Sequence, residues 1–197
     1  GIAGIPWWTT DIGGFFGANI NDPEFHELLV RWFEYGCFCP VMRLHGYRWP
    51  LQPQYGTTGG ATCVSGAPNE VWSYTDQVCE ILSDYLRLRE RMLPYITELM
   101  EEAHEKGTPV MRPLFYDFPE DKESWNVETE YMFGPKVLVK PITDADARET
   151  DVYLPGGASW TNAWTGETFE GGQKVHVAAP IEQIPLFTRD GYKLPMK

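Results

Sequence analysis

Residues 6–16 read Pro6-Trp7-Trp8-Thr9-Thr10-Asp11-Ile12-Gly13-Gly14-Phe15-Phe16, and the interpretation of the whole chain starts from them. Aromatic and β-branched residues lead into a carboxylate, two glycines and two further aromatic residues, which is typical of a strand that ends in a ligand-binding loop. Aromatic rings beside a carboxylate suit a sugar, because carbohydrates present apolar C–H faces and hydroxyls together. A buried strand followed by a Gly-Gly turn, with Asp11 as a local cap, explains the same residues, and this stretch alone leaves both interpretations open.

A helix and a second strand are expected to follow this stretch. Asp22 can cap a helix, Pro23 suits the first helical position and Glu24 favours the positive end of the helix. Gly36 is expected to end the helix. Residues 37–46 are predicted to form the second strand, which again finishes in polar groups and a glycine. The apolar face expected to pack inward consists of Phe25, Leu28, Leu29, Trp32 and Phe33.

Strand, loop, helix and strand together make a βαβ unit, in which the two strands run parallel. In parallel α/β structures the ligand lies at the carboxyl ends of the strands, and Asp11, Arg43 and His45 all fall there. Arg43 and His45 are two residues apart and therefore share one face of a regular strand. Arg43 beside Asp11 would keep the carboxylate ionised and oriented. We expect the three side chains on one rim, with a structural role as the alternative for His45.

The middle of the chain is predicted to be a long loop and then a helix. Residues 47–72 are rich in Pro, Gly, Thr and Gln without periodicity, which favours a functional or lid-like loop over the rim. Residues 73–76 (Ser-Tyr-Thr-Asp) are expected to open the helix with a capping box. Pro94 should kink or split the helix near Leu93, and Gly107 marks its end.

One face of this helix is predicted to be buried and another to be solvated. The inward residues are expected to be Val78, Ile81, Leu82, Tyr85, Leu86, Leu93, Ile96, Leu99 and Met100. The charged residues Arg87, Arg89, Glu90 and Arg91 are interpreted as a solvated or salt-bridged face rather than a binding patch.

Beyond Thr108 the pattern changes to short apolar stretches separated by Gly, Pro and Asp turns, which predicts an antiparallel β-sandwich. The stretches are 110–118, 131–142, 150–154, 159–164, 174–178 and 184–188. The clearest turns are residues 155–157 and 170–172. Trp160 and Trp164 are interpreted as core residues, with stacking on a sugar as the alternative.

Composition and charge narrow the class of partner. The chain has 197 residues, 28 acidic against 16 basic, so its net charge of -12 disfavours nucleic acid and anionic membranes and suits a neutral ligand. No apolar run approaches the ~18 residues of a membrane span, and no leader pattern begins the chain. The cysteines lack the spacing of a zinc site, with His45 only distantly placed, so we expect buried free thiols, no metal and no cofactor. These cysteines are Cys37, Cys39, Cys63 and Cys79.

Several motifs, in order, resemble glycoside hydrolase family 31, which holds the α-glucosidases and α-xylosidases. Residues 8–15, 31–32 and 42–46 look like its late barrel strands and the helix between them, and residues 91–95 like its last barrel helix. The family's C-terminal β-sandwich is resembled by residues 131–135, 153–155, 164–167 and 184–187. The resemblance covers almost the whole chain. It implies α/β plus all-β architecture, with 1–108 as the last two βα units of a (β/α)8 barrel and 109–197 as the sandwich.

The resemblance implies a retaining α-glycosidase with an aspartate nucleophile and an aspartate acid/base, which such a mechanism holds roughly 5 Å apart. In the family both aspartates lie on strands before the one that ends in Asp11, so no catalytic residue is expected in this chain, and the isolated chain is expected to be inactive. Asp11, Phe15, Arg43 and His45 match the family's sugar-binding positions around the −1 subsite. Trp8 is a further candidate for the pocket wall.

The resemblance also implies partners and leaves two questions open. An α-linked oligosaccharide or glycoside is the expected substrate, and the chain is expected to associate with the missing barrel half or with itself. Glucose and xylose are not separated by the sequence, although residues 50–54 leave room for an α-xylosidase. A carbohydrate-binding or structural module, with the sandwich as its working part, is the alternative class of function.

Overall fold

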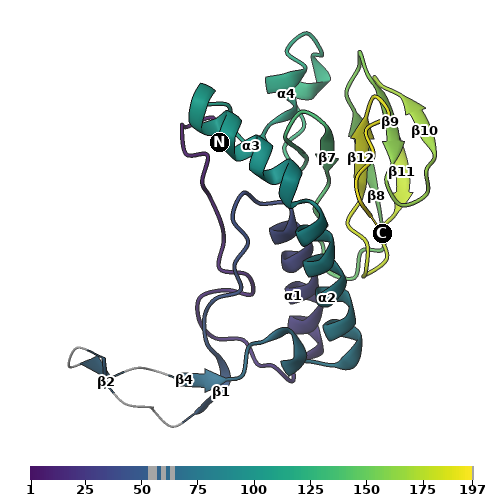
Figure 1. Cartoon of the computed structure of the whole chain (residues 1–197). Coiled ribbons are helices and arrows are strands. Elements are labelled where there is room, and N and C mark those ends of the chain that lie inside the picture. Colours follow the sequence, from purple (N-terminus) through teal and green to yellow (C-terminus); the bar gives the residue numbers. More distant parts are fainter. Residues whose placement is uncertain (53–56, 59–60, 63–64, 197) are drawn as a thin grey trace.

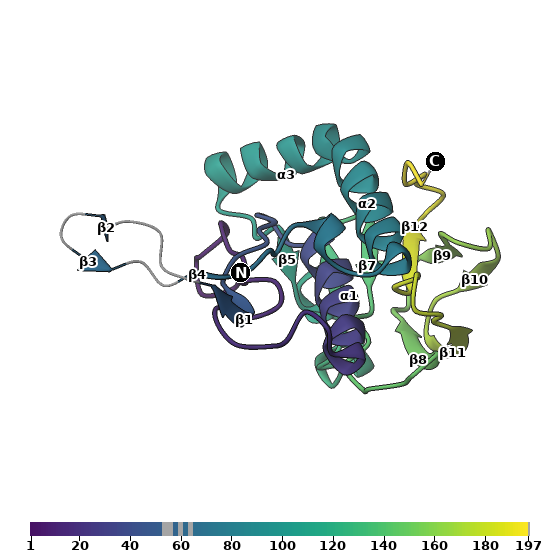
Figure 2. The same ribbon diagram turned by 90° about the horizontal axis from the view of Figure 1, so that it is seen from below.

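The computed structural model describes residues 1–52, 57–58, 61–62 and 65–196. Two antiparallel helices stand between extended N-terminal segments on one side and the β-sheets on the other, and this order holds in both views (Figures 1 and 2). These helices are α1 (Pro23–Cys37) and α2 (Asp76–Arg91), and α3 (Leu93–Lys106) continues from α2 at an angle. The mixed architecture is the predicted one, whereas the division at residue 108 stays a prediction.

Helix α1 begins as predicted and ends one residue later. The Asp22 carboxylate accepts the Glu24 backbone N–H at 3.0 Å, and Pro23 is the first helical residue. The helix continues through Cys37, so the expectation that Gly36 ends it is wrong. A Cβ atom at Gly36 would lie 2.5 Å from Ile12 Cδ1, so this glycine serves the packing of the helix on the first extended segment.

Neither the strand predicted to lead into Asp11 nor the strand predicted at residues 37–46 is formed. The two extended segments share one parallel bridge, between Ile12 and Leu44, in which the Ile12 N–H donates to the Arg43 carbonyl at 3.2 Å. Gly13, at a φ of 81°, turns the chain directly after Ile12, and Pro40 has no N–H to pair, so a continuous ladder does not develop. The segments are nevertheless parallel and joined by α1, as the βαβ interpretation requires.

Helices α2 and α3 confirm the predicted break and correct the predicted cap. Pro94 lies in the first turn of α3, and Gly107 ends α3 at a φ of 72°. Thr75, rather than Ser73, caps α2, because its hydroxyl accepts the Val78 N–H at 3.3 Å.

Three leucines expected on buried helix faces are exposed instead, and each lines a surface hollow. These residues are Leu28, Leu86 and Leu93.

Arg89 is not part of a solvated face, which corrects the sequence interpretation. Its guanidinium donates to the carbonyls of Cys37, Cys39 and Pro40 at 2.6–2.8 Å. These carbonyls lie at the last residue of α1 and just beyond it, so Arg89 ties α2 to the start of the second extended segment. Arg87 does lie on the surface, where it pairs with Asp84 at 2.7 Å.

The segment predicted as a long loop contains a β-ribbon. Strands β1 (Arg48–Gln52) and β4 (Ser65–Ala67) pair antiparallel, as do β2 (Thr57–Thr58) and β3 (Ala61–Thr62). Figures 1 and 2 show β2 well away from the helices. A short 3₁₀ turn, η1 (Val71–Ser73), leads into α2. The lid expectation falls partly on residues 53–56, 59–60 and 63–64, which lie outside the described residues.

The C-terminal part forms two antiparallel sheets. The larger has the order β10-β9-β12-β7-β6-β5, and the smaller pairs β11 with β8. Residues 110–118 contain a strand only at β5, because Pro113 interrupts the ladder and α4 (Leu114–Asp117) follows, with η2 (Glu123–Trp125) beyond it. The strands are β5 (Met111–Arg112), β6 (Tyr131–Phe133), β7 (Val137–Val139), β8 (Glu149–Leu154), β9 (Ser159–Asn162), β10 (Thr168–Glu170), β11 (Gln173–Ala178) and β12 (Leu186–Arg189).

Both faces of the larger sheet are buried. Alternate residues of β6 and β12 point to opposite sides, so Met132 and Phe187 pack toward β8 and β11, whereas Phe133 and Leu186 pack toward the helices. Trp160 is fully buried between the two sheets, and its indole N–H donates to the Pro155 carbonyl at 2.9 Å. The prediction that Trp160 is a core residue is confirmed.

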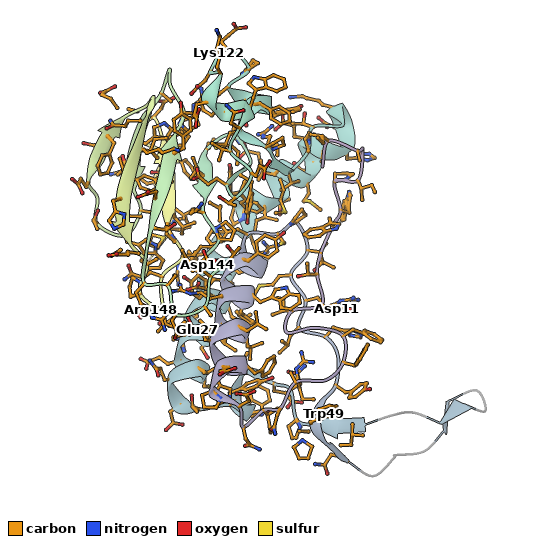
Figure 3. The ribbon with its side chains drawn as sticks, turned by 180° about the vertical axis from the view of Figure 1, so that it is seen from behind. Asp11, Glu27, Trp49, Lys122, Asp144 and Arg148 are labelled. Carbon is orange, nitrogen blue, oxygen red and sulfur yellow. The ribbon has the colours of Figure 1, made fainter. Side chains whose placement is uncertain are left out.

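A buried polar network joins α1 to the sandwich. The Arg31 guanidinium donates to Glu34 and to four backbone carbonyls at 2.7–3.3 Å, those of Ala147, Ala179, Pro180 and Gln183. Burial raises the pKa of Glu34 to about 8 despite the neighbouring Arg31. An ion pair of 2.6 Å between Glu27 and Arg148 lies at the same junction (Figure 3).

Candidate functional site

Asp11 and Arg43 meet where the two extended segments run side by side. The Arg43 guanidinium donates to Asp11 Oδ1, and the Gly14 N–H donates to the Asp11 carbonyl at 2.7 Å. The pair is partly open, with the carboxylate side chain 25 % exposed and the arginine side chain 50 % exposed. Asp11 lies on the side of the molecule away from the sandwich (Figure 3). The arginine thus orients one carboxylate oxygen and leaves the other able to accept a ligand hydroxyl.

Phe15 and His45 form a second pair from the same two segments. Their ring centroids are 5.5 Å apart with an interplanar angle of 35°. Both rings line a depression of about 540 Å³, whose other lining residues are Leu44, Gly46, Tyr47, Asn69 and Glu70. Phe15 is 59 % exposed, so its face is available to an apolar C–H surface.

Gly46 allows the two loops to touch. It has a φ of 105°, and a Cβ atom there would lie 2.4 Å from the carbonyl oxygens of Gly14 and Phe15. The Tyr47 N–H donates to the Phe15 carbonyl at 3.3 Å and adds a direct link between the loops. Any larger residue at position 46 would push the Phe15 loop away from the His45 loop.

Trp8 is placed apart from these two pairs. Its ring packs edge-on to Tyr35 at 6.4 Å, and its carbonyl accepts the Val41 N–H at 3.1 Å. The depression takes in Phe15 and His45 but not Asp11, Arg43 or Trp8. The structure therefore brings the candidates together as two pairs on adjoining loops, and their assignment to one sugar pocket stays a prediction.

Asn69 and Glu70 were missed by the sequence reasoning. Asn69 donates through Nδ2 to the Gly46 carbonyl at 3.2 Å and accepts from the Tyr74 hydroxyl at 2.5 Å. Both residues belong to the segment that the sequence treats as an aperiodic loop. They lie beside His45 because strand β4 pairs antiparallel with β1 and brings the chain back toward that residue. No local sequence pattern predicts this pairing.

The cysteines and helices add no further site within the described residues. Cys37 and Cys39 are buried free thiols, and burial raises the pKa of each to about 12. Cys63 lies outside the described part of the chain. No group of His, Cys, Asp and Glu there is arranged to hold a metal ion, and no helix there has both the length and the apolar character to cross a membrane.

The sandwich offers little support for sugar binding through its tryptophans. Trp160 has no exposed surface, so it cannot stack on a ligand. Trp164 is partly buried, and its indole N–H donates to the Ile184 carbonyl at 2.7 Å. The alternative that Trp160 stacks on a sugar is therefore wrong.

Two family models together match nearly the whole chain. The TIM-barrel domain of glycosyl hydrolases family 31 matches residues 1–99, and the glycosyl hydrolase family 31 C-terminal domain matches residues 107–194. An α-xylosidase of Saccharolobus solfataricus is 38 % identical over 99 % of this chain. Alpha-glucosidase 2 of Bacillus thermoamyloliquefaciens is 35 % identical over 97 % of it. The chain spans about a quarter of the length of these relatives, 24 % and 22 % respectively.

Solved structures of xylosidases also match almost the whole chain. A family 31 α-xylosidase from a soil metagenome, crystallised with xylose, superposes with a TM-score of 0.92 at 51 % identity and covers 98 % of this chain. This chain accounts for 29 % of that protein. A xylosidase from Aspergillus niger superposes with a TM-score of 0.81 at 37 % identity, over 95 % of this chain and 28 % of the other.

Proposed function

The chain belongs to glycosyl hydrolase family 31, and from this premise we propose that it is the C-terminal part of a retaining α-glycosidase. Residues 1–108 supply the last two βα units of the barrel, and residues 109–197 supply the C-terminal sandwich. The proposal is supported by the two family models and by relatives that match over almost the full chain. The parallel segments joined by α1 fit the place of these units in a barrel.

We infer that Asp11, Arg43, Phe15 and His45 form one wall of the sugar pocket. The ion pair between Arg43 and Asp11 carries this inference, because it joins the carboxyl ends of both segments at the edge where barrel enzymes bind their ligands. Asp11 accepts hydrogen bonds from ring hydroxyls, and Arg43 fixes the orientation of its carboxylate. Phe15 and His45 contact the apolar face of the sugar, and Trp8 extends the wall.

The covalent chemistry is proposed to lie outside this chain. A retaining glycosidase attacks the anomeric carbon with one carboxylate and protonates the leaving oxygen with another. We assign both roles to aspartates of the preceding barrel strands, as the family resemblance implies. The residues of this chain hold the ring in place while those groups react. The isolated chain is accordingly expected to lack activity.

An α-xyloside is the proposed substrate rather than an α-glucoside. The support is the higher identity to α-xylosidases, 51 % in the metagenomic structure and 38 % in the archaeal enzyme, against 35 % for the bacterial α-glucosidase. A xylose pocket differs from a glucose pocket by the space for one hydroxymethyl group, a change worth about 1–3 kcal/mol in discrimination.

The remaining barrel is the proposed partner of an apolar groove between the extended segments and helices α2 and α3. The groove encloses about 1000 Å³, and its lining includes Trp7, Val41, Trp72, Leu86, Leu93 and Met100. It adjoins the second extended segment, on the side where a barrel requires its next strand and helix. Covering this groove would bury side chains that are now exposed to solvent.

The experiment uses the full-length protein that carries this segment and p-nitrophenyl α-D-xyloside and α-D-glucoside as substrates. We expect turnover of the xyloside in preference to the glucoside. Asp11→Asn should lower kcat/KM by about 100-fold, the order expected when a charge-assisted contact of about 3 kcal/mol is lost. Asp84→Asn, on the exposed face of α2, is the matched control and should leave kcat/KM unchanged.

Three results would contradict the proposal. The first is full activity of the Asp11→Asn variant, and the second is turnover of either glycoside by the isolated chain of residues 1–197. The third is a folded full-length protein that hydrolyses other substrates but neither of these two glycosides.

A further inference from the structure

Arg48 is a fully buried arginine that lies between the two loops of the candidate site. It is the first residue of strand β1 and has no exposed surface. A buried guanidinium must find hydrogen-bond partners, because an unsatisfied buried charge is costly. The identity of these partners indicates what Arg48 does.

Each terminal nitrogen of Arg48 bridges the two loops. Nη1 donates to the Gly14 carbonyl at 2.8 Å and to the Tyr47 carbonyl at 3.1 Å. Nη2 donates to the Ile12 carbonyl at 3.1 Å and to the His45 carbonyl at 3.4 Å. The guanidinium therefore joins residues 12–14 to residues 45–47 twice.

Three of the four carbonyls belong to candidate sugar-binding residues or to their immediate neighbours. Ile12 follows Asp11, and Gly14 precedes Phe15, while His45 is itself a candidate. The positions of the Asp11 carboxylate and the Phe15 and His45 rings depend on the backbone at these points. A shift of the guanidinium would displace side chains of both loops relative to each other.

Neighbouring residues restrict the position of the Arg48 side chain and backbone. A Cβ atom at Gly13 would lie 2.5 Å from Nη2, and one at Gly66 would lie 2.3 Å from the Arg48 carbonyl oxygen. The guanidinium carbon also lies 5.4 Å from the centroid of the Phe25 ring on α1. Gly13 and Phe25 thus confine the guanidinium and the direction of its donors, whereas Gly66 confines the backbone of Arg48.

A lysine cannot replace these contacts. The planar guanidinium directs donors from two nitrogens toward separate acceptors, whereas an ammonium is a single point charge with different geometry. An ammonium has three donors, so at least one of the four carbonyls would lose its partner, and the loops would no longer be held in one register.

We propose that Arg48 is a positioning residue. By donating to both loops, it holds residues 11–15 in a fixed position relative to residues 43–47, and it thereby sets the positions of the side chains that form the sugar pocket. The inference rests on the proposed function for its effect on catalysis. It does not depend on that function for its effect on the loops, so the two can be tested separately.

The test compares Arg48→Lys with Arg31→Lys in the full-length protein. Arg31 is the matched control, because it is also a buried arginine on backbone carbonyls but lies at the junction with the sandwich. Steady-state kinetics with p-nitrophenyl α-D-xyloside gives kcat and KM. Hydrogen exchange by mass spectrometry, without sugar, reports on residues 8–16 and 41–47.

We expect Arg48→Lys to lower kcat/KM by about 100-fold, the scale of a misplacement near 1 Å, and to speed exchange in both segments. Arg31→Lys should lower the thermal midpoint but leave kcat/KM of the folded protein within about twofold and exchange in these segments unchanged. Unchanged exchange in Arg48→Lys, or a loss of kcat/KM no greater than that of Arg31→Lys, overturns the proposal.

Gly66→Ala serves as a second variant if Arg48→Lys does not fold. It keeps the guanidinium but displaces the Arg48 backbone, and it should raise exchange in the same two segments. Unchanged exchange would also overturn the proposal. A wild-type protein that turns over neither xyloside nor glucoside contradicts the proposed function alone, because the exchange measurement still decides whether Arg48 holds the loops.

Discussion

The two halves of the molecule bury their apolar side chains to different extents. Among the described residues, thirteen of the fifteen large exposed hydrophobic side chains lie before residue 94, and only Tyr116 and Trp125 lie in the second half. In the sandwich, Trp160 and Phe187 have no exposed surface at all. In the first half, Trp7, Phe16 and Trp72 are more than 60 % exposed.

This difference indicates that the two halves complete their cores in different ways. The sandwich packs its strands against each other and against α1–α3, so among the described residues only two of its large apolar side chains are exposed. The first half has a buried face toward the sandwich and an open apolar groove on the other side. An open apolar surface of this kind is typical of a protein–protein interface.

The largest effect is expected from Trp160→Ala. Truncation of a fully buried tryptophan should cost about 3–5 kcal/mol of unfolding free energy, because the cavity between the two sheets cannot collapse. Thermal unfolding of the isolated chain of residues 1–197 measures the loss. Trp72→Ala is the control, since this side chain is 72 % exposed within the chain. Equal losses for the two variants in the isolated chain would remove the contrast between the halves.

Leu86→Gln should lower the stability of the full-length protein and reduce the self-association of the isolated chain. In the full-length protein it places a polar group in the proposed interface and should cost about 1.5–3 kcal/mol, the value of one buried leucine. In the isolated chain it should reduce self-association, as measured by sedimentation velocity, because less apolar surface is exposed. Tyr116→Gln, on α4, should behave alike in both contexts. A neutral effect of Leu86→Gln in the full-length protein would mean that the groove stays open.

Stability should fall as pH rises from about 5 to about 8. Burial raises the pKa of Glu34 to about 8 and that of Glu130 to about 7, so the folded state keeps protons that the unfolded chain releases in this range. Raising the pH therefore favours unfolding. The thermal midpoint measured across this range should decline, and Glu34→Gln should flatten the decline. An unchanged slope in the variant would show that Glu34 does not titrate there.

The smallest effect is expected from Arg87→Ala. This residue forms an exposed i, i+3 ion pair with Asp84 on α2, and both side chains are about two-thirds exposed. Such a pair contributes about 0.2–1 kcal/mol and is screened by salt. A loss comparable to that of Trp160→Ala would imply that the outer face of α2 is also buried in the complete protein.

Much of the local structure follows from the sequence. Asp22 and Pro23 specify the start of α1, and Pro94 specifies the break between α2 and α3, because caps and proline act on backbone within one turn. The β-stretches after residue 130 are visible as short apolar runs between turns. The motifs around Asp11 and His45 are also sufficient to identify the family.

The arginines that donate to backbone carbonyls were not predictable in the same way. Arg89 was assigned to a solvated face, and Arg31 and Arg48 were given no buried role, yet all three donate to backbone carbonyls that lie far away in the sequence or on another element. Charged residues are rarely buried, so a local pattern assigns them to the surface. Only the folded chain brings unpaired carbonyls to them.

The amino-acid order was sufficient for the helices, the sandwich and the family, because capping, periodicity and short motifs act over a few neighbouring residues. The sequence also placed Arg43 beside Asp11, and the structure confirms that pair. The three-dimensional fold alone decided that Trp8 stands apart and that Leu86 remains uncovered. These outcomes depend on packing between segments separated by tens of residues, and such contacts form only when the whole chain closes its core.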